Sequence, residues 1–265
     1  MPLVVAHRGS SGRYAEHTLT AYEKAVAEGA DALECDVRLT RDGVLVCVHD
    51  RTVTRTSDGR GRVSTLELAE LAELDFGSWK ARQHDELLEA SWEEPDRDGR
   101  TVLTLERLVQ LVRDHDRPVQ LHVETKHPTR YGGLVEKALV DLLDRYGLAS
   151  PLSRSVSQVT VMSFAPTSLR RVHAMAPGLP TVYLMARVPL RYRDGTLPPQ
   201  IELAGPSLDV LKAHPHYVER VHEQGNRVHV WTVDSPEDIA FVLGLGVDAV
   251  ISNHPTRVLH QLDRA

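Results

Sequence analysis

Two acidic residues inside an apolar segment give the first chemical signal in this sequence. Glu34 and Asp36 lie two positions apart within the strand-like run Ala32–Leu39. Side chains two positions apart on a β-strand share one face, so both carboxylates point the same way and Cys35 points the opposite way. Two like charges in apolar surroundings are costly unless a cation offsets them, and that cation is either a metal ion or an arginine.

A third carboxylate repeats the pattern. Glu124 ends the apolar run Val119–Glu124, and Lys126 follows it two positions later. Three carboxylates without a histidine or cysteine cluster favour a hard divalent cation, Mg²⁺ or Ca²⁺, over zinc. We therefore predict a cation site made by Glu34, Asp36 and Glu124, with its open positions taken by substrate oxygens and water.

Two histidines stand out among the 14 in the chain because each ends an apolar strand-like run. His7 follows Leu3–Ala6, and His49 follows Val44–Val48. An imidazole titrates near neutral pH, so this pair could supply a general base and a general acid.

Further cationic and aromatic side chains lie at strand ends. Arg8 can bind a phosphate through two parallel hydrogen bonds, and Lys126 can offset the charge of another phosphate oxygen. Trp231, within the run Val228–Val233, is either a core residue or a wall of the alcohol pocket. A metal, two histidines and two cations are the groups that move charge on a phosphodiester.

Alternating strand-like and helical runs must position these residues. This alternation indicates parallel βαβ units, and about eight of them predict a (β/α)₈ barrel, with an open doubly wound sheet as the alternative. No Gly-x-Gly-x-x-Gly follows the first strand, which disfavours the dinucleotide-binding version of that sheet. Besides the runs already named, we predict strands at Thr181–Met185, Val159–Ser163, Ala249–Ser252 and, more weakly, Ile201–Ala204, and helices at Thr18–Glu28, Thr104–His115, Gly133–Tyr146, Pro166–Ala176, His216–Gln224, Ser235–Leu243 and Pro255–Leu262.

One stretch interrupts the alternation. Residues 51–100 are too long for a loop, contain a short helix-like run at Thr65–Leu74, and become polar from Lys80 onward. We interpret this stretch as an insertion carried by the barrel. No low-complexity linker divides the chain, so residues 1–265 are expected to form one domain.

Composition sets outer limits on function. The chain has 31 Lys and Arg against 37 Asp and Glu, a formal charge of −6, which argues against a nucleic-acid-binding protein. Cys35 and Cys47 lie in apolar runs and are expected to be buried free thiols. No secretory signal or membrane-spanning run is visible, so we expect a cytoplasmic protein without stable membrane insertion.

An ordered set of motifs resembles the glycerophosphodiester phosphodiesterase family. The set spans nearly the whole chain and comprises His7-Arg8-Gly9, Glu16-His17-Thr18, Glu34-Cys35-Asp36-Val37, Val48-His49-Asp50, Arg55-Thr56-Ser57-Asp58-Gly59, Thr104-Leu105, Glu124 with Lys126, Val230-Trp231-Thr232-Val233 and Gly246-Val247-Asp248. The resemblance implies a (β/α)₈ barrel with a small insertion after the strand that bears His49. It further implies that His7 and His49 are the acid/base pair, that Glu34, Asp36 and Glu124 hold the metal, and that Arg8 and Lys126 bind the phosphate.

Two segments depart from the family pattern. The family usually has Pro-Glu-Asn-Thr where this chain has Ala15-Glu16-His17-Thr18. It usually ends its last strand with Thr-Asp before an aromatic residue and proline, where this chain has Ser252-Asn253-His254-Pro255. We expect these departures to alter the rim of the site, and so the choice of alcohol, without altering the chemistry.

The resulting hypothesis is hydrolysis of a glycerol-type phosphodiester, a small-molecule substrate, to an alcohol and glycerol 3-phosphate. The rivals are the same chemistry on a lysophospholipid or a glycerophosphoinositol, a catalytically silent binding module, and an aldolase in which Lys126 forms a Schiff base. The sequence leaves open the alcohol, the choice of cation, the roles of the two histidines, a cyclic phosphate intermediate and the oligomeric state.

Overall fold

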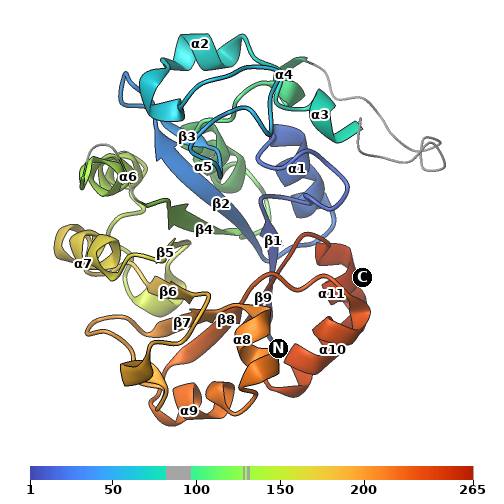
Figure 1. The fold of residues 1–265 in the computed structure, drawn as a ribbon, viewed down its shortest axis with the longest axis vertical. Coiled ribbons are helices and arrows are strands. Elements are labelled where there is room, and N and C mark those ends of the chain that lie inside the picture. The colour runs from blue at the N-terminus through green and yellow to red at the C-terminus, as the bar shows by residue number, and fades with distance from the viewer. Residues whose placement is uncertain (82–96, 128, 130–131, 265) are drawn as a thin grey trace.

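Short strands of β-branched and apolar residues alternate with amphipathic helices in the computed structural model, which describes residues 1–81, 97–127, 129 and 132–264 (Figure 1). The strands are β1 (Leu3–His7), β2 (Ala32–Leu39), β3 (Leu45–Cys47), β4 (Gln120–Thr125), β5 (Val159–Ser163), β6 (Thr181–Met185), β7 (Leu203–Pro206), β8 (Arg227–Val230) and β9 (Ala249–Ser252). The helices are α1 (Leu19–Ala27), α2 (Leu68–Ala72), α3 (Ser78–Ala81), α4 (Arg97–Arg100), α5 (Leu105–Arg113), α6 (Leu134–Arg145), α7 (Pro166–Met175), α8 (Leu208–Ala213), α9 (Tyr217–Glu223), α10 (Pro236–Gly244) and α11 (Pro255–Gln261).

Eight parallel strands close into a barrel. The hydrogen-bonded order is β1-β9-β8-β7-β6-β5-β4-β2, and β1 also pairs with β2, which joins the two ends of the sheet. In that closing pair Val5 lies opposite Ala32 and His7 lies opposite Glu34. The predicted (β/α)₈ barrel is therefore confirmed, and the alternative of an open sheet is excluded.

Strand β3 is the exception to the parallel order. It was predicted correctly as a strand, but it runs antiparallel to β2 and lies outside the barrel wall. The Asp42-Gly43 turn reverses the chain, with Gly43 at φ 86°, a conformation that glycine adopts without strain. β2 is long enough to pair with β1 as far as Glu34 and with β3 from Val37 onward, so the ends of β1 and β3 approach each other along one edge of β2.

The position of strand β7 differs from the sequence prediction. The weak strand expected at Ile201–Ala204 is shifted to Leu203–Pro206, because Gly205 and Pro206 pair with β6 instead of ending the strand. Pro206 has no N–H to donate, but its carbonyl oxygen accepts a hydrogen bond from the N–H of Trp231 at 3.3 Å. A side chain at Gly205 would meet those of Val182 and Leu184 at 2.8 Å, so a larger residue there would force both neighbours to shift. The short helix α8 that follows was not predicted.

Apolar residues form separate inner and outer layers. The barrel interior holds a small cluster that includes Val5, Met162, Leu184 and Ile251. Two larger clusters lie between the sheet and its helices, and the predicted free thiols Cys35 and Cys47 are buried in one of them. Along β2 this places Cys35 among the helices and Glu34 and Asp36 inside the barrel, as the two-residue period predicts.

The insertion has a small core of its own. Val53, Val63 and Leu71 pack with Val46 and Val48 at β3, and helix α2 falls within the predicted run Thr65–Leu74. Most of the polar tail expected between Lys80 and Arg100 lies outside the described residues. No helix in the described part of the chain has the length and hydropathy needed to cross a membrane.

A stacked pair of histidines fills the interior below the rim. His122 on β4 and His229 on β8 have ring centroids 5.4 Å apart and planes 8° from parallel. Both rings are buried, and both nitrogens of His122 and Nδ1 of His229 have no hydrogen-bond partner in the described part of the chain. Burial holds the pKa of His229 well below its ordinary value of 6.5, so the ring is neutral in the folded protein.

We expect this buried ring to make the fold sensitive to acid. Below the unfolded pKa of 6.5, the unfolded chain binds a proton at His229 that the folded chain rejects. The free energy of unfolding then falls by about 1.4 kcal/mol per pH unit until the folded pKa is reached. His229→Phe should reduce this decrease, as measured by urea unfolding at pH 7.5 and pH 5. The matched control is His260→Gln at an exposed helix position, and an unchanged pH dependence in His229→Phe would contradict the expectation.

Candidate active site

Three carboxylates converge at the carboxyl end of neighbouring parallel strands. Glu34 and Asp36 come from β2 and Glu124 from β4, and Asp36 lies directly opposite Glu124 in the strand register. The nearest oxygens of the three groups lie within 4.8 Å of one another, and all three residues are buried. This is the only such cluster of potential metal ligands among the described residues, and it contains the three residues predicted from sequence.

The charges in this cluster are strongly coupled. Burial and the neighbouring charge of Asp36 raise the pKa of Glu34 well above its ordinary range and raise that of Glu124 to about 8. Burial alone would also raise the pKa of Asp36, but Arg8, His17 and Lys126 hold it well below its ordinary range. Ionisation of all three carboxyl groups is therefore unfavourable with only Arg8 and Lys126 nearby, and a bound metal ion would stabilise the three charges together.

Arginine and lysine pairing accounts for part of the cluster. Nε of Arg8 lies 3.0 Å from Asp36 Oδ2, and Nζ of Lys126 lies 3.2 Å from Asp36 Oδ1 and 2.9 Å from Glu124 Oε1. No described arginine or lysine side chain lies within ion-pair distance of Glu34, whose Oε2 instead accepts a bond from the backbone N–H of Arg8. Apart from its ion pair with Lys126, Asp36 Oδ1 is buried without a hydrogen-bond partner among the described residues. These oxygens fit a hard cation.

His7 ends β1 beside Glu34, and its ring has a defined tautomer. Nδ1 lies 2.7 Å from Oδ1 of Asn253, an oxygen that can only accept, so Nδ1 carries the hydrogen. The amide orientation is fixed in turn, since Nδ2 of Asn253 donates to Asp234. Burial, together with the charge of Arg8, lowers the pKa of His7 to about 4, so Nε2 presents a lone pair toward the site.

His49 follows β3 and reaches the site from the other side. Its Nδ1 donates to Oδ1 of Asp50 at 2.7 Å, and Arg55 in turn donates to Oδ2 of Asp50 at 2.7 Å. Although burial alone would raise it, the bonds from Arg55 and His49 lower the pKa of Asp50 to about 2, so the partner of His49 is a carboxylate. Arg38 fixes the backbone here by donating Nε and Nη2 to the carbonyl oxygen of His49.

A cavity of about 110 Å³ lies over these groups. Trp231 lies just beyond the end of β8, where its ring meets that of Phe164 edge-on at 5.3 Å and its Nε1 donates to the carbonyl of Gly205. Trp231 therefore lines the cavity and also packs against the interior apolar cluster. The cavity is lined by seven of the eight residues predicted for the site, namely His7, Arg8, Glu34, His49, Glu124, Lys126 and Trp231.

At both departures from the family pattern the structure shows a direct contact with a predicted site residue, which the sequence did not predict. His17 is buried, and its ring lies within hydrogen-bond distance of Asp36 at Nε2 (3.0 Å) and of the Tyr22 hydroxyl at Nδ1 (2.8 Å). Asn253 is the residue that orients His7. Both replacements thus contact proposed catalytic or metal-binding groups directly. The sequence marked the positions but could not show their contacts.

Sequence reasoning also missed a charged network that joins the two sides of the site. Glu16 accepts from Nη1 of Arg8 at 3.0 Å and from both terminal nitrogens of Arg55. Because Arg55 also bonds Asp50, it connects the groups behind Arg8 with those behind His49. Glu16 and Arg55 belong to two of the motifs shared with the family, and this membership was the only indication in the sequence that they take part in the site.

The fold and the site define a TIM-barrel enzyme with an acidic cluster and a histidine pair at the catalytic face of the barrel. Residues 7–257 match the glycerophosphoryl diester phosphodiesterase family, and the chain belongs to this family of phosphoric diester hydrolases.

Relatives cover nearly the whole chain. A Mycobacterium tuberculosis protein named probable glycerophosphodiester phosphodiesterase 1 is 49% identical over 259 residues, which are 97% of this chain and 90% of that protein. Mouse lysophospholipase D GDPD3 is 24% identical over 292 residues, covering 98% of this chain and 82% of that protein. An Oleispira antarctica phosphodiesterase, solved in complex with the product sn-glycerol-3-phosphate, superimposes with a TM-score of 0.84 at 25% identity, covering 99% of this chain and 97% of that one.

Proposed function

We propose that this protein hydrolyses glycerophosphodiesters to an alcohol and glycerol 3-phosphate, with a divalent cation and the histidine pair His7 and His49. The observation that carries the proposal is the single small cavity bounded by the carboxylate cluster, both histidines, Arg8 and Lys126. The family membership and the product named in the Oleispira structure support the substrate class.

Glu34, Asp36 and Glu124 would hold the cation, which is Mg²⁺ or Ca²⁺ because all three donors are carboxylate oxygens. When bound, the cation supplies Lewis-acid stabilisation of charge on a phosphate oxygen. Arg8 and Lys126 flank Asp36 and would bind the remaining non-bridging oxygens of the diester. Their position between phosphate and carboxylates keeps both cations charged and in place.

The hydrogen-bond partners of the two histidines indicate which histidine is the base and which is the acid. His7 Nε2 carries a lone pair, and its Nδ1 partner is a neutral amide, which favours the base. Burial lowers the pKa of His49, but its hydrogen bond to the carboxylate of Asp50 acts in the opposite direction by stabilising an imidazolium, so His49 suits the acid. His7 would take the proton of the attacking oxygen as that oxygen bonds to phosphorus. His49 would then protonate the oxygen of the alcohol as its bond to phosphorus breaks.

The size of the cavity favours a small water-soluble alcohol, such as glycerol, ethanolamine or choline, over a long acyl chain. A space of about 110 Å³ is well below the roughly 300–1,000 Å³ of pockets that enclose large organic ligands. Trp231 and Phe164 offer an apolar wall that suits a short carbon segment of the substrate. Because one relative is named a lysophospholipase D, the experiment also includes an acylated substrate.

The test compares kcat/KM for glycerophosphocholine, glycerophosphoglycerol and lysophosphatidylcholine, with Mg²⁺, with Ca²⁺ and with excess chelator. We expect turnover of the two soluble diesters, loss of turnover on chelation, and at least about ten-fold lower kcat/KM for the acylated substrate, equivalent to 1.4 kcal/mol. Phosphorus NMR identifies the product and any cyclic phosphate formed by attack of a neighbouring hydroxyl. A preference for lysophosphatidylcholine would replace the proposed substrate class.

A further inference from the structure

A continuous chain of hydrogen bonds between charged side chains runs along one side of the site. It leads from Arg8 through Glu16, Arg55 and Asp50 to His49, and we call these five residues the rim network. Its two ends are groups with proposed roles in the reaction, a phosphate-binding arginine and the acid histidine. None of its three middle members is among the described residues that line the catalytic cavity, so any role they have is exerted through the two ends.

Arg55 uses all three kinds of guanidinium nitrogen in this network. Nη1 and Nη2 donate to the two oxygens of Glu16 at 2.8 and 2.7 Å, and Nε donates to Asp50 Oδ2 at 2.7 Å. The paired bonds to Glu16 have a fork geometry that a lysine cannot reproduce. Although 42% of the Arg55 side chain is exposed, a bidentate pair within a charge network holds its geometry better than an isolated surface ion pair.

Glu16 anchors this guanidinium group to the barrel. It lies between β1 and α1, its side chain is 11% exposed, and it also accepts from Nη1 of Arg8 at 3.0 Å. Burial alone would raise the pKa of Glu16, but the bonds from Arg55 and the charge of Arg8 lower it to about 2, so Glu16 is ionised at neutral pH. Arg55 itself lies on a turn in which the N–H of Thr56 donates to the carbonyl of Val53, a residue of the insertion core. The network therefore joins the insertion to the barrel beside the site.

His49 depends on support from outside its own strand. It follows β3, 33% of its side chain is exposed, and its partner Asp50 is the next residue in the chain, with 31% exposed. A partly exposed carboxylate holds a ring in place only if another group holds the carboxylate. Arg55 does so at Oδ2, which leaves Oδ1 to accept from Nδ1 of His49 and so sets the direction of Nε2.

We propose that Arg55 is a positioning residue for the acid step: through Asp50 it aligns His49 with the oxygen of the leaving alcohol, while Glu16 holds Arg55 at a fixed place beside Arg8. The inference rests on the proposed function and extends its machinery to the insertion. Arg55 transfers no proton itself. It matters because a general acid must lie within roughly 2.6–3.2 Å of the oxygen that it protonates, and a small displacement of the donor is costly.

A double-mutant cycle on kcat separates positioning from a purely structural tie. With glycerophosphoglycerol as substrate, Arg55→Gln should lower kcat at least about ten-fold and change KM little. In the His49→Ala background the same substitution should lower kcat by less than about two-fold, because the group that it positions is gone. An equal factor in both backgrounds overturns the inference. Arg60→Gln, an exposed arginine of the same segment, is the matched control and should keep the wild-type kcat.

A second substrate isolates the acid step. The leaving oxygen of the p-nitrophenyl ester of glycerol 3-phosphate needs no proton, so Arg55→Gln should lose little activity on this ester. Equal losses on the ester and on glycerophosphoglycerol overturn the inference. Glu16→Gln loosens both arginines, so it should raise KM for both substrates through Arg8 and lower kcat mainly for glycerophosphoglycerol through Arg55. An unchanged kcat for glycerophosphoglycerol in Glu16→Gln overturns its role as the anchor.

Arg55→Lys keeps the positive charge and is the second variant if Arg55→Gln does not fold. Because lysine lacks the fork that bonds Glu16 and Asp50 together, this variant should show the same dependence on background and on leaving group. A wild-type kcat in Arg55→Lys overturns the inference. The proposed function has a separate criterion: a normal kcat in His49→Ala overturns the acid role on which the inference rests, whereas an impaired His49→Ala with a normal Arg55→Gln overturns the inference alone.

Discussion

Glu34→Gln, Asp36→Asn and Glu124→Gln are each expected to lose more than about 100-fold in turnover, since even groups that only support metal ligands cost 10–100-fold when changed. Each variant removes one of three carboxylates whose oxygens lie within 4.8 Å of one another. Cation affinity, measured by titration calorimetry with Mg²⁺ and Ca²⁺, should fall together with the rate. Asp141→Asn, which alters an exposed carboxylate paired with Lys137 on α6, is the control and should behave like the wild type.

Thermal unfolding separates a metal-binding role from a structural one. A cation that binds only the folded state raises the melting temperature of the wild type, and it should raise that of the three variants much less. Without cation, Glu34→Gln should unfold at the same or a higher temperature than the wild type, because it removes a carboxyl group whose ionisation burial and Asp36 disfavour. A fully chelated wild-type enzyme that turns over at its normal rate would refute the metal site.

His7→Ala and His49→Ala are expected to lower kcat by roughly 10²–10⁴-fold, the usual contribution of a positioned acid or base. Both side chains lie at strand ends facing the cavity, so their removal should leave folding intact. His260→Ala, at an exposed position on α11, is the matched control. A near-normal rate in either strand-end variant would remove that histidine from the mechanism.

The leaving group distinguishes the acid from the base. A p-nitrophenyl ester of glycerol 3-phosphate releases an oxyanion that needs no proton, so a general acid contributes little to its cleavage. If His49 is the acid, His49→Ala should lose much less activity on this ester than on glycerophosphoglycerol. His7→Ala should lose similar factors on both. The opposite pattern would exchange the two roles, while equal losses in both variants would contradict the division of work that their partners, Asn253 and Asp50, indicate.

The sequence by itself determined the barrel and the chemical inventory of its rim. Apolar runs with a period of two placed Glu34 and Asp36 on one face of a strand, and the alternation of runs predicted parallel βαβ units. These features are local, since the backbone geometry of a strand fixes the direction of each side chain without reference to its neighbours. The predicted ends of strands were less accurate where the residue types are uncommon in strands. Gly205 and Pro206 are of this kind, and yet they pair with β6.

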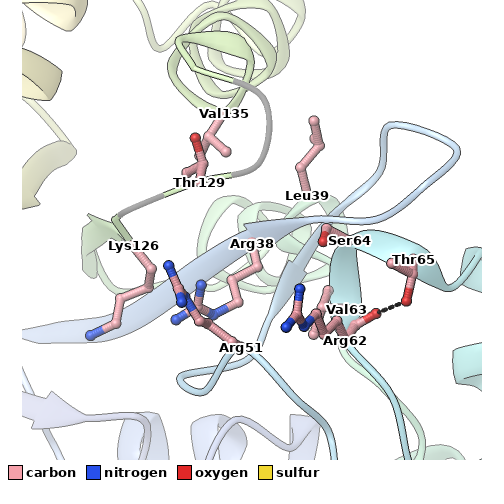
Figure 2. A pocket seen from close by; sticks show the side chains of 10 residues that line it. All are labelled: Arg38, Leu39, Arg51, Arg62, Val63, Ser64, Thr65, Lys126, Thr129 and Val135. Carbon is pink, nitrogen blue, oxygen red and sulfur yellow. Dashed lines mark hydrogen bonds between the residues drawn. The ribbon is translucent and has the colours of Figure 1, made fainter.

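The tertiary structure alone decided which groups meet. A strand ending at His49 does not specify its partner, and only the antiparallel pairing of β3 with β2 returns that histidine to the end of β1. The contacts of Asn253 with His7 and of His17 with Asp36 join residues 246 and 19 positions apart, distances over which a periodic pattern carries no information. Arg38, Arg51 and Arg62 are the same case, because they line one cavity only through the pairing of the segments that carry Arg51 and Arg62 (Figure 2). Strand pairing and barrel closure are long-range choices, set by the packing of the whole chain, and they decide whether suitable residues become a site.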